Sequence, residues 1–272
     1  MSRTKFDGQV AVVTGAGSGI GRALALALAR RGCKLALADV NADTLAETAR
    51  LLPAPPLTRA LDVADRAAVH AFAAEVEARL GPADLVFNNA GVALIQTISD
   101  TRHEDLEWLM NINFYGVVHG CQAFLPAMLA RRSGVLVNVS SLYGLIGWPA
   151  QTAYCAAKFA VRGYTEAMRH DLHGTGVRAV CVHPGGIRTN IVRAARFTRD
   201  DLGREDAAPL IAEFDRFARM SPERAASVIL YGVERGDERI VVGADAKLLS
   251  LWQRVRPEGY FKIVRWFGSR FR

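Results

Sequence analysis

The chain has 272 residues, of which 50% are hydrophobic and 22% are charged, so it can bury a substantial core and does not have a disordered composition. Its four cysteines form no CxxC pair or ligand cluster, which argues against a disulfide framework and a zinc site, and we expect no bound metal. The formal net charge is +7, but seven basic residues and one acidic residue fall within residues 247–272, so the main body is nearly neutral and nucleic-acid binding is not expected.

The N-terminal segment is not expected to act as a targeting signal. Residues 1–8 lead into a short apolar run, whereas a membrane span needs about 18 to 20 apolar residues. We therefore expect a cytoplasmic protein.

Short β-branched runs alternate with Ala-rich or amphipathic stretches along the chain. Strands are predicted at 9–14, 34–39, 84–88, 134–140, 178–183 and 239–243, and another strand is expected to carry Leu61 and Asp62 after a rigid turn at 53–56. Helices are predicted at 22–31, 66–80, 104–131 and 152–172. This order predicts an α/β, doubly wound (Rossmann-like) three-layer fold with a mostly parallel central sheet, whose ligand site lies at the carboxyl ends of the strands. We expect residues 1–272 to form a single domain.

A glycine-rich segment, Thr14 to Gly21, follows the first predicted strand. Its spacing, with glycines at 15, 19 and 21, does not fit the general GxGxxG template. Glycines at a strand-to-helix turn nevertheless let a pyrophosphate approach the N–H groups of the helix N-terminus. The position of the segment favours dinucleotide binding.

Asp39 ends the second predicted strand, where a carboxylate can bind the ribose hydroxyls of a dinucleotide. The alternative role for Asp39 is to cap a following helix. A ribose-binding carboxylate would repel a 2′-phosphate, so NAD is favoured over NADP unless a basic residue intervenes. Arg22 and Lys34 are the candidates for that residue, and we interpret both as solvated surface charges.

Ser140 and Ser141 lie at the carboxyl end of the predicted strand 134–140. Serines often cap such strand ends, which is the alternative role for Ser140. The Ser141 hydroxyl could instead hydrogen-bond a substrate oxygen and stabilise its charge.

Tyr154 and Lys158 are four residues apart and share one face of the predicted helix 152–172. A cation about 5 Å from the phenol, at an effective dielectric constant of about 20, favours the phenolate by roughly two pK units. We therefore expect Lys158 to lower the pKa of Tyr154 into a range useful for acid/base catalysis. Taken alone, this spacing is common by chance, and a packing role for Tyr154 is the alternative.

The motifs together resemble the short-chain dehydrogenases/reductases over roughly residues 5 to 245. The matching segments are Thr14 to Gly21, Asp62-Val63, Asn88-Asn89-Ala90-Gly91, Asn113 within Asn111 to Gly116, Ser141, Tyr154-xxx-Lys158, and Pro184-Gly185 with Thr189. Their agreement in order and spacing is far more specific than any one of them.

The resemblance implies a division of roles. Tyr154 would be the general acid/base, Lys158 would bind the nicotinamide ribose, Ser141 would orient the substrate oxygen, and Asn113 would anchor a water in the proton relay. Asn113 is preferred to Asn111 because Phe-Tyr-Gly follows it. Asn89, Ala90 and Gly91 would line the adenosine side, Asp62 would meet the adenine, and the loop from Pro184 to Thr189 would contact the nicotinamide end.

The full set of expected cofactor-binding residues combines the glycine segment, Asp39 and these motifs. It comprises Gly15, Ser18, Gly19, Ile20, Gly21, Asp39, Asp62, Val63, Asn89, Ala90, Gly91, Tyr154, Lys158, Pro184, Gly185, Ile187 and Thr189. The resemblance also implies a homodimer or homotetramer built through the helices around 104–131 and 152–172.

The substrate is indicated only by apolar residues. The resemblance implies a lid at about 190–220, and this segment contains several apolar side chains among many charges. Further apolar residues near the expected site are Leu94, Ile95, Leu142, Tyr143, Ile146 and Trp148. They favour a secondary alcohol or ketone with a hydrophobic body, and packing of the lid and the subunit contact is the alternative role for these residues.

The C-terminal segment 247–272 extends beyond the end of many family members. Helical spacing places Leu248, Trp252 and Val255 on one face of a basic, aromatic-rich extension. It could cover a subunit or the substrate pocket, lie on an anionic membrane as a peripheral contact, or bind nucleic acid, in that order of preference.

The sequence thus predicts an oxidoreductase that transfers a hydride between NAD(H) and a secondary alcohol or ketone. The alternatives are an NADP-dependent ketoreductase and a non-catalytic, dinucleotide-binding regulatory or scaffold protein. The presence of Ser141, Tyr154 and Lys158 favours the enzyme, because a binding protein needs none of them.

Overall fold

The computed structural model describes residues 4–262 and has a seven-stranded sheet at its centre. The strand order is β3-β2-β1-β4-β6-β7-β9, and every neighbouring pair is parallel. The strands are β1 (Val10–Thr14), β2 (Lys34–Asp39), β3 (Leu57–Ala60), β4 (Leu85–Asn88), β6 (Gly134–Val139), β7 (Val177–Pro184) and β9 (Arg239–Val242). The predicted doubly wound fold is confirmed.

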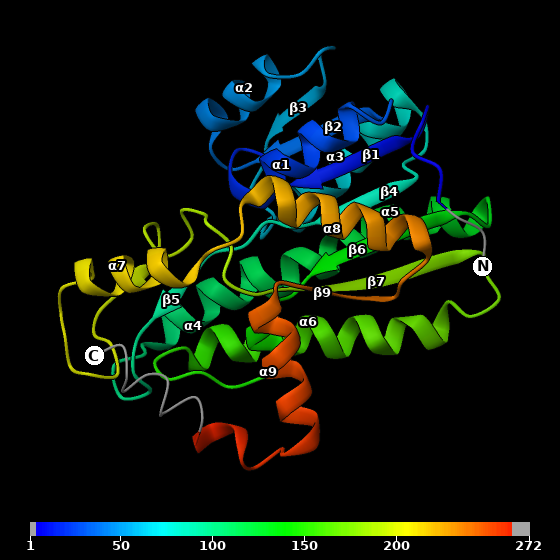
Figure 1. The fold of residues 1–272 in the computed structure, drawn as a ribbon. Coiled ribbons are helices and arrows are strands. Elements are labelled where there is room, and N and C mark those ends of the chain that lie inside the picture. Colours follow the sequence, from blue (N-terminus) through cyan, green and yellow to red (C-terminus); the bar gives the residue numbers. More distant parts are fainter. Residues whose placement is uncertain (1–3, 263–272) are drawn as a thin grey trace.

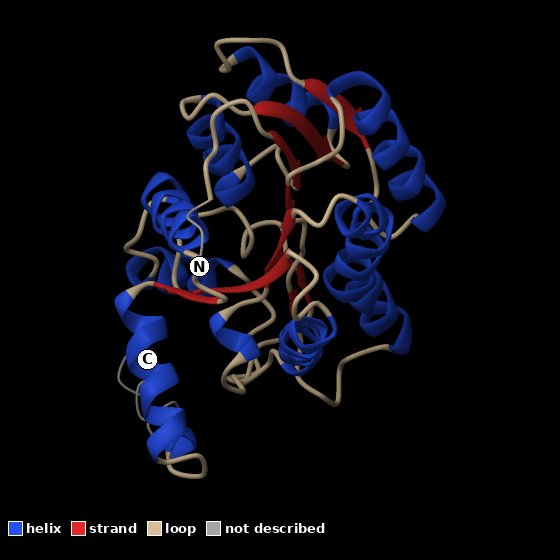
Figure 2. Cartoon of the chain, turned by 90° about the vertical axis from the view of Figure 1, so that its right-hand side faces the viewer, coloured by secondary structure: helices blue, strands red, loops and turns tan. Residues whose placement is uncertain are grey.

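Helices cover both faces of this sheet (Figures 1 and 2). The helices are α1 (Gly19–Ala29), α2 (Ala42–Arg50), α3 (Arg66–Leu80), α4 (His103–Met110), α5 (Gly116–Ala130), α6 (Thr152–Asp171), α7 (Ala208–Phe217), α8 (Pro222–Arg235) and α9 (Ala244–Val255). One hydrophobic core lies between one face of the sheet and helices α1, α2 and α8. A second lies between the other face and helices α3, α5 and α6. The strands read as continuous apolar runs because both of their faces are buried in this way.

Two predicted elements differ from the structure. The strand expected to carry Leu61 and Asp62 ends at Ala60, so both residues lie in the loop that follows β3. The helix expected at 104–131 is interrupted by a π-helical turn, Asn111–Tyr115, between α4 and α5. The Asn113 side chain in this turn accepts a hydrogen bond from the Val92 N–H and donates one to the Val92 carbonyl, each at 2.8 Å. Such π-helical insertions are frequent at functional sites.

A short second sheet and α7 lie beside the carboxyl-end edge of the main sheet, at the left of Figure 1. Strand β5 (Leu94–Ile95) pairs in parallel with β8 (Arg196–Phe197), which brings the segment after Thr189 back to the loop after β4. The expected lid region therefore has secondary structure of its own.

A chain of buried polar side chains ties α6 to the strands beneath it. Asn88 donates to Asn138 Oδ1 at 2.8 Å, Asn138 donates to Thr165 Oγ1 at 3.0 Å, and Thr165 donates to the Val161 carbonyl at 2.7 Å. Asn138 and Thr165 are fully buried, so water cannot replace a lost partner.

Thr165→Val is expected to lower the free energy of unfolding by about 1–3 kcal/mol, because it leaves the buried Asn138 amide without its acceptor at nearly constant side-chain volume. Urea unfolding followed by circular dichroism measures the change. Ser227→Ala is the matched control, because Ser227 makes the same type of hydrogen bond to a preceding helical carbonyl but is exposed, and its effect should stay within about 0.5 kcal/mol. Equal stability of Thr165→Val and the wild type would contradict this role for the polar chain.

Candidate active site

The glycine segment forms a tight turn from β1 into α1. Gly15 has φ +66 and Gly19 has φ +50, values that an L side chain rarely adopts. A Cβ at position 15 would lie 2.8 Å from Ala90 Cα, and one at position 21 would overlap the Gly15 carbonyl oxygen. The turn can therefore be built only from residues without side chains at these positions.

The N-terminus of α1 fits a pyrophosphate. Ser18 occupies the N-cap position without making a side-chain cap, and no acidic residue lies in the first turn. The helix thus offers N–H donors and the positive end of its dipole, as an anion requires.

Asn89 and Thr14 fasten the loop after β4 to this turn. The Asn89 side chain donates to the carbonyl oxygens of Thr14 at 3.0 Å and Gly15 at 3.4 Å. Thr14 Oγ1 accepts the backbone N–H groups of Asn89 at 3.0 Å and Ala90 at 3.1 Å. The two segments expected to hold the cofactor are therefore adjacent and rigidly connected.

Asp39 contacts the glycine turn directly. Its Oδ2 accepts the Gly17 N–H at 2.8 Å, and its Oδ1 accepts the Asn41 N–H at 2.9 Å. The cap of α2 is made instead by the Asn41 side chain, which accepts from Asp43 and Thr44. Asp39 therefore does not have the helix-capping role, and its carboxylate lies at the end of β2 beside the glycine turn.

Arg22 is not the solvated surface charge expected from the sequence. Its guanidinium donates to the carbonyl oxygens of Gly17 and Thr44 and to the Thr48 hydroxyl, and it forms an ion pair with Glu47 at 2.9 Å. The arginine thus joins the glycine turn to α2. The sequence feature that could have indicated this role is its position directly after Gly21. Lys34 is exposed at the start of β2, at the opposite end of the strand from Asp39.

Asp62 and Val63 lie just beyond β3. Asp62 is exposed and its Oδ1 accepts the Ala64 N–H at 2.9 Å, which orders the loop. Val63 is buried, and a Cβ at Gly116 would lie 2.7 Å from its Cγ2. The Val63 side chain therefore packs against α5, and Asp62 is the residue of this pair with a side chain open to a ligand.

Ser141, Tyr154 and Lys158 meet at the carboxyl end of β6. Lys158 Nζ donates to the Val139 carbonyl at 3.1 Å and lies 5.7 Å from the centre of the Tyr154 ring. Ser140 lies beside them, and its hydroxyl donates to the Lys158 carbonyl at 2.7 Å, so it fixes α6 to the strand end instead of capping the strand. Lys158 is thus positioned by contacts with this strand end.

Asn113 and Gly91 complete this cluster. A Cβ at Gly91 would lie 3.0 Å from Asn113 Oδ1 and 3.3 Å from Lys158 Nζ, so the three residues are in direct proximity. Asn113 is buried while Asn111 is exposed, which agrees with the choice between them. Gly91 lies beside the lysine.

The pKa of Tyr154 is raised, contrary to expectation. Burial of the phenol raises it to about 12, and a hydrogen bond with Ser141 opposes this change. The expectation, which considered only the charge of Lys158, omitted the cost of removing a phenolate from water, and this cost is the largest influence on the pKa of Tyr154. The same burial lowers the pKa of Lys158 to about 8.

His183 was not identified from the sequence. It is fully buried at the end of β7, and its Nδ1 lies 3.1 Å from the Ser141 carbonyl oxygen. Burial lowers the pKa of His183 to about 4, so the ring is neutral at pH 7 and can donate one N–H to that carbonyl. The sequence feature that could have indicated a role for His183 at the site is its position directly before Pro184-Gly185.

The loop from Pro184 to Thr189 runs from β7 towards the glycine turn. The Gly185 N–H donates to the Val242 carbonyl at 2.8 Å, and the Gly186 N–H donates to Asp245 at 2.7 Å. A Cβ at Gly19 would lie 3.0 Å from Thr189 Cγ2, so the loop reaches the start of α1. Ile187 is buried in the core and can offer a ligand only its backbone. A hollow of about 160 Å³ lies here, between Gly19, Arg22, Thr189 and Asn190.

The lid region is fastened to α4 through a buried carboxylate. Asp105 is buried, pairs with Arg196 at 2.9 Å and with Arg102 at 3.1 Å, and accepts a hydrogen bond from Gln96. Gln96 also donates to Thr198 at 3.0 Å. These contacts hold the pKa of Asp105 at about 2, so the carboxylate is ionised at neutral pH.

Aromatic and apolar side chains surround Tyr154. Tyr143 makes an edge contact with Tyr154 at 6.0 Å and stacks on Trp148 at 5.4 Å. Leu94 and Ile191 pack in the same cluster as Tyr154. Leu142, Ile146 and Trp148 pack instead with residues of the C-terminal segment. The predicted apolar residues thus divide between the surroundings of Tyr154 and the contact with the C-terminal segment.

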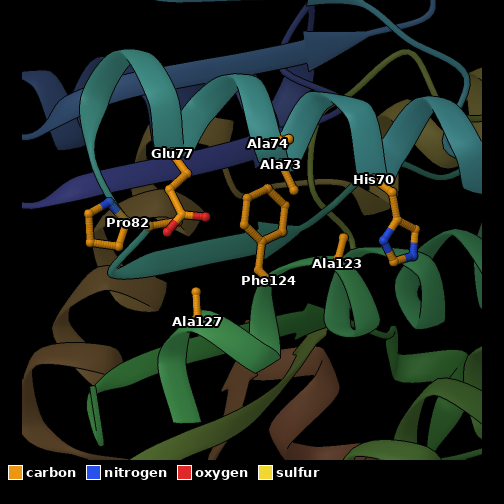
Figure 3. A pocket seen from close by; sticks show the side chains of 9 residues that line it. His70, Ala73, Ala74, Glu77, Pro82, Ala123, Phe124 and Ala127 are labelled. Carbon is orange, nitrogen blue, oxygen red and sulfur yellow. The ribbon is translucent and has the colours of Figure 1, made fainter. Parts of the chain in front are cut away.

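Another hollow, also about 160 Å³, lies away from these residues. It is formed between α3 and α5, with His70, Glu77, Pro82 and Phe124 in its wall (Figure 3). It shares no residue with the candidate site.

Among residues 4–262, no three His, Cys, Asp or Glu side chains are grouped so that they could hold a metal ion. Within the same range, no helix is both long and apolar enough to cross a bilayer. All four cysteines are free.

Comparisons with known proteins agree with this arrangement. The family model described as short chain dehydrogenase matches residues 9–200. The chain is 46% identical to "Putative oxidoreductase SadH" of Mycobacterium tuberculosis over 96% of this chain and 95% of that protein. It is 34% identical to the 3-oxoacyl-[acyl-carrier-protein] reductase FabG of Thermotoga maritima over 84% of this chain and 91% of that protein. A short-chain dehydrogenase/reductase of Burkholderia phymatum, solved in complex with NAD, is 30% identical and superposes with a TM-score of 0.86 over 94% of this chain and 96% of that one.

Lys158→Met is expected to stabilise the protein at pH 7 by about 1–3 kcal/mol, although it removes a candidate catalytic group. The folded pKa of about 8 lies below the ordinary 10.5, so between these values the unfolded chain binds more protons and the stability of the wild type rises with pH. Below pH 8 the wild type carries the full cost of burying the ammonium. Urea unfolding at pH 7 and at pH 10 measures the difference.

The advantage of Lys158→Met over the wild type should therefore shrink as the pH rises. Lys34→Met is the control, because Lys34 is exposed and should show no such pH-dependent gain. A Lys158→Met protein that is less stable than the wild type at pH 7 would contradict the buried-charge argument.

Proposed function

The chain belongs to the short-chain dehydrogenase/reductase family of oxidoreductases, and we propose that it transfers a hydride between NAD(H) and a secondary alcohol or ketone with a hydrophobic body. The observation that carries this proposal is the convergence of Ser141, Tyr154, Lys158 and Asn113 on the sheet edge that also holds the glycine turn. A protein that only bound a dinucleotide would not need the first three.

The residues at this edge fit a dinucleotide. The uncapped N-terminus of α1 suits the pyrophosphate, and Asp39 suits the ribose hydroxyls because each oxygen keeps a lone pair beyond its backbone contact. When bound, the nicotinamide ring supplies or accepts the hydride.

The side chains around Tyr154 supply the proton transfer. With a pKa of about 12 the phenol is protonated at neutral pH, so Tyr154 is set to donate its proton to a carbonyl oxygen. Ser141 Oγ accepts the Tyr143 N–H at 3.1 Å, which orients its own O–H towards the substrate oxygen and Tyr154. Lys158 and Asn113 lie behind the phenol as the next groups of the relay.

Asp39 and Arg22 together support NAD over NADP. The carboxylate would repel a 2′-phosphate, and Arg22 is already engaged by Gly17, Thr44 and Glu47. Structures of related enzymes from Burkholderia phymatum and Mycobacterium paratuberculosis are described as bound to NAD.

The apolar surroundings of Tyr154 support a substrate with a hydrophobic body. Tyr143, Leu94 and Ile191 lie in contact with the cluster around the phenol. An apolar wall of this kind binds hydrocarbon by burial and offers few polar partners to a sugar.

We also propose a homodimer or homotetramer built through α4, α5 and α6. Three large side chains on these helices and the turn between α4 and α5 are exposed in the single chain: Tyr115 at 48%, Leu129 at 38% and Phe159 at 40%. A partner subunit would cover them.

Tyr154→Phe is expected to lower kcat for ketone reduction by about 10²–10⁴-fold, because the ring remains and the proton donor is lost. A panel of ketones and secondary alcohols assayed with NADH and NAD⁺ provides the substrate for this measurement. Tyr164→Phe, on the same helix, is the control and should retain wild-type activity. Full activity of Tyr154→Phe would refute the assigned role, and the absence of turnover across the panel would favour a binding protein.

Asp39→Ala is expected to reduce the preference for NADH over NADPH by about 10–100-fold in kcat/KM, because the repulsion of the 2′-phosphate and the ribose contacts are lost together. Asp43→Ala removes an exposed carboxylate in the first turn of α2 and should leave the preference unchanged. Tighter binding of NADPH than NADH by the wild type would contradict the assignment of Asp39.

A further inference from the structure

Helix α9 follows strand β9 at the carboxyl-end edge of the sheet, where the candidate catalytic residues lie. It begins at Ala244, directly after β9, and extends away from the rest of the fold (Figures 1 and 2). Its first turn is fixed by Asp245, whose carboxylate accepts the Gly186 N–H in the loop after β7.

One face of α9 is packed and cannot turn outward. Ala246 and Ser250 are buried, and Arg239 of β9 donates to Ser250 Oγ at 3.0 Å. Leu249 packs against a cluster that includes Leu142, Leu145 and Ile146, in the segment that follows Ser141. The orientation of the helix about its own axis is therefore set by contacts with the body of the protein.

The opposite face of α9 is apolar and exposed. The exposed fractions are 61% for Leu248, 60% for Leu251, 42% for Trp252 and 67% for Val255. These positions fall on one stripe of a helix with 3.6 residues per turn. Phe261, shortly after the helix, is 55% exposed. A contiguous stripe of this kind on a fixed helix marks a contact surface.

Basic residues border this stripe. Lys247 and Arg254 flank it on one side of α9, and Arg256 and Lys262 follow it, with Glu258 as the one acidic residue of 247–262. The remaining residues of the sequence, 263–272, add three arginines and the aromatic residues Trp266, Phe267 and Phe271, and they lie outside the described residues. Apolar and aromatic side chains bordered by lysine and arginine are typical of helices that lie in the interface of an anionic bilayer.

We propose that this face of α9 binds an anionic membrane surface, with Leu248, Leu251, Trp252 and Val255 inserted at the level of the headgroups. The charge favours a membrane over a second copy of the chain, because two copies joined along this stripe would bring their basic borders together. Four side chains also cover only part of the roughly 800 Å² per partner that a stable protein interface buries.

The membrane contact would also orient the candidate active site. Tyr260, beyond α9, accepts the Gly147 N–H at 3.1 Å and packs in the cluster with Leu142 and Ile146. The C-terminal segment thus touches the loop between Ser141 and Tyr154. If the proposed function holds, the substrate is an amphiphile dissolved in the membrane that carries its alcohol or ketone near the headgroups.

Cosedimentation of the full chain with vesicles tests the proposal without substrate. We expect binding to vesicles of phosphatidylcholine with about 30% phosphatidylglycerol, weak binding to pure phosphatidylcholine, and loss of binding as NaCl rises from about 50 to about 500 mM. The double variant Leu251→Glu/Trp252→Glu should bind at least tenfold more weakly. The control Leu51→Glu/Tyr231→Glu adds the same charge at exposed apolar positions of other elements and should bind like the wild type.

Three results would overturn the proposal. These are no binding of the wild type to anionic vesicles, equal binding by Leu251→Glu/Trp252→Glu, and an oligomer in size-exclusion chromatography that this variant dissociates, which would assign the stripe to a second copy. Circular dichroism confirms that each variant is folded. Vesicle binding is measured without turnover. If the proposed reaction is wrong, the binding result still stands, and if binding fails, the proposed reaction is unaffected.

Discussion

The buried ammonium of Lys158 is the constraint on which the rest of the candidate site depends. Removing this charge from water lowers its pKa to about 8, so the fold must supply polar partners at a defined place. The Val139 carbonyl accepts a hydrogen bond from the ammonium. Gly91, which has no side chain, lies beside the ammonium, and Asn113 lies next to Gly91. Ser140 holds the lysine backbone against the strand end. The π-helical turn that carries Asn113 inward is the local distortion by which the chain reaches this arrangement.

A second set of contacts joins the candidate cofactor-binding residues to the candidate proton-transfer residues along one edge of the sheet. Asn89 and Thr14 join the loop after β4 to the glycine turn, and three residues after Asn89 the same loop reaches Asn113 through Val92. Arg22 joins that turn to α2, and Asp39 fixes it from β2. A shift of the glycine turn would therefore be transmitted to Asn113 through these hydrogen bonds.

Patterns along the sequence predicted most of the architecture because buried strands and glycine turns leave local signals. Asp39 and Ser141 were predicted as site residues because each lies at the end of a predicted strand, and Tyr154 and Lys158 because they are four residues apart on a predicted helix. The break at 111–115 left no periodic signal, since it arises from a tertiary contact of Asn113 with Val92. The engagement of Arg22, the contact of His183 and the raised pKa of Tyr154 depend on burial and on partners distant in sequence. These contacts and effects of burial can be described only from the folded structure.

Hydride transfer itself is the central claim, and isotope transfer tests it most directly. The protein is incubated with a hydrophobic ketone and NADH that carries deuterium at the reactive C4 position, and the alcohol is analysed by mass spectrometry and NMR. One deuterium is expected on the carbinol carbon, with solvent hydrogen on the oxygen where Tyr154 delivers its proton. An alcohol formed without deuterium at carbon, or formed equally well when the dinucleotide is omitted, would contradict hydride transfer.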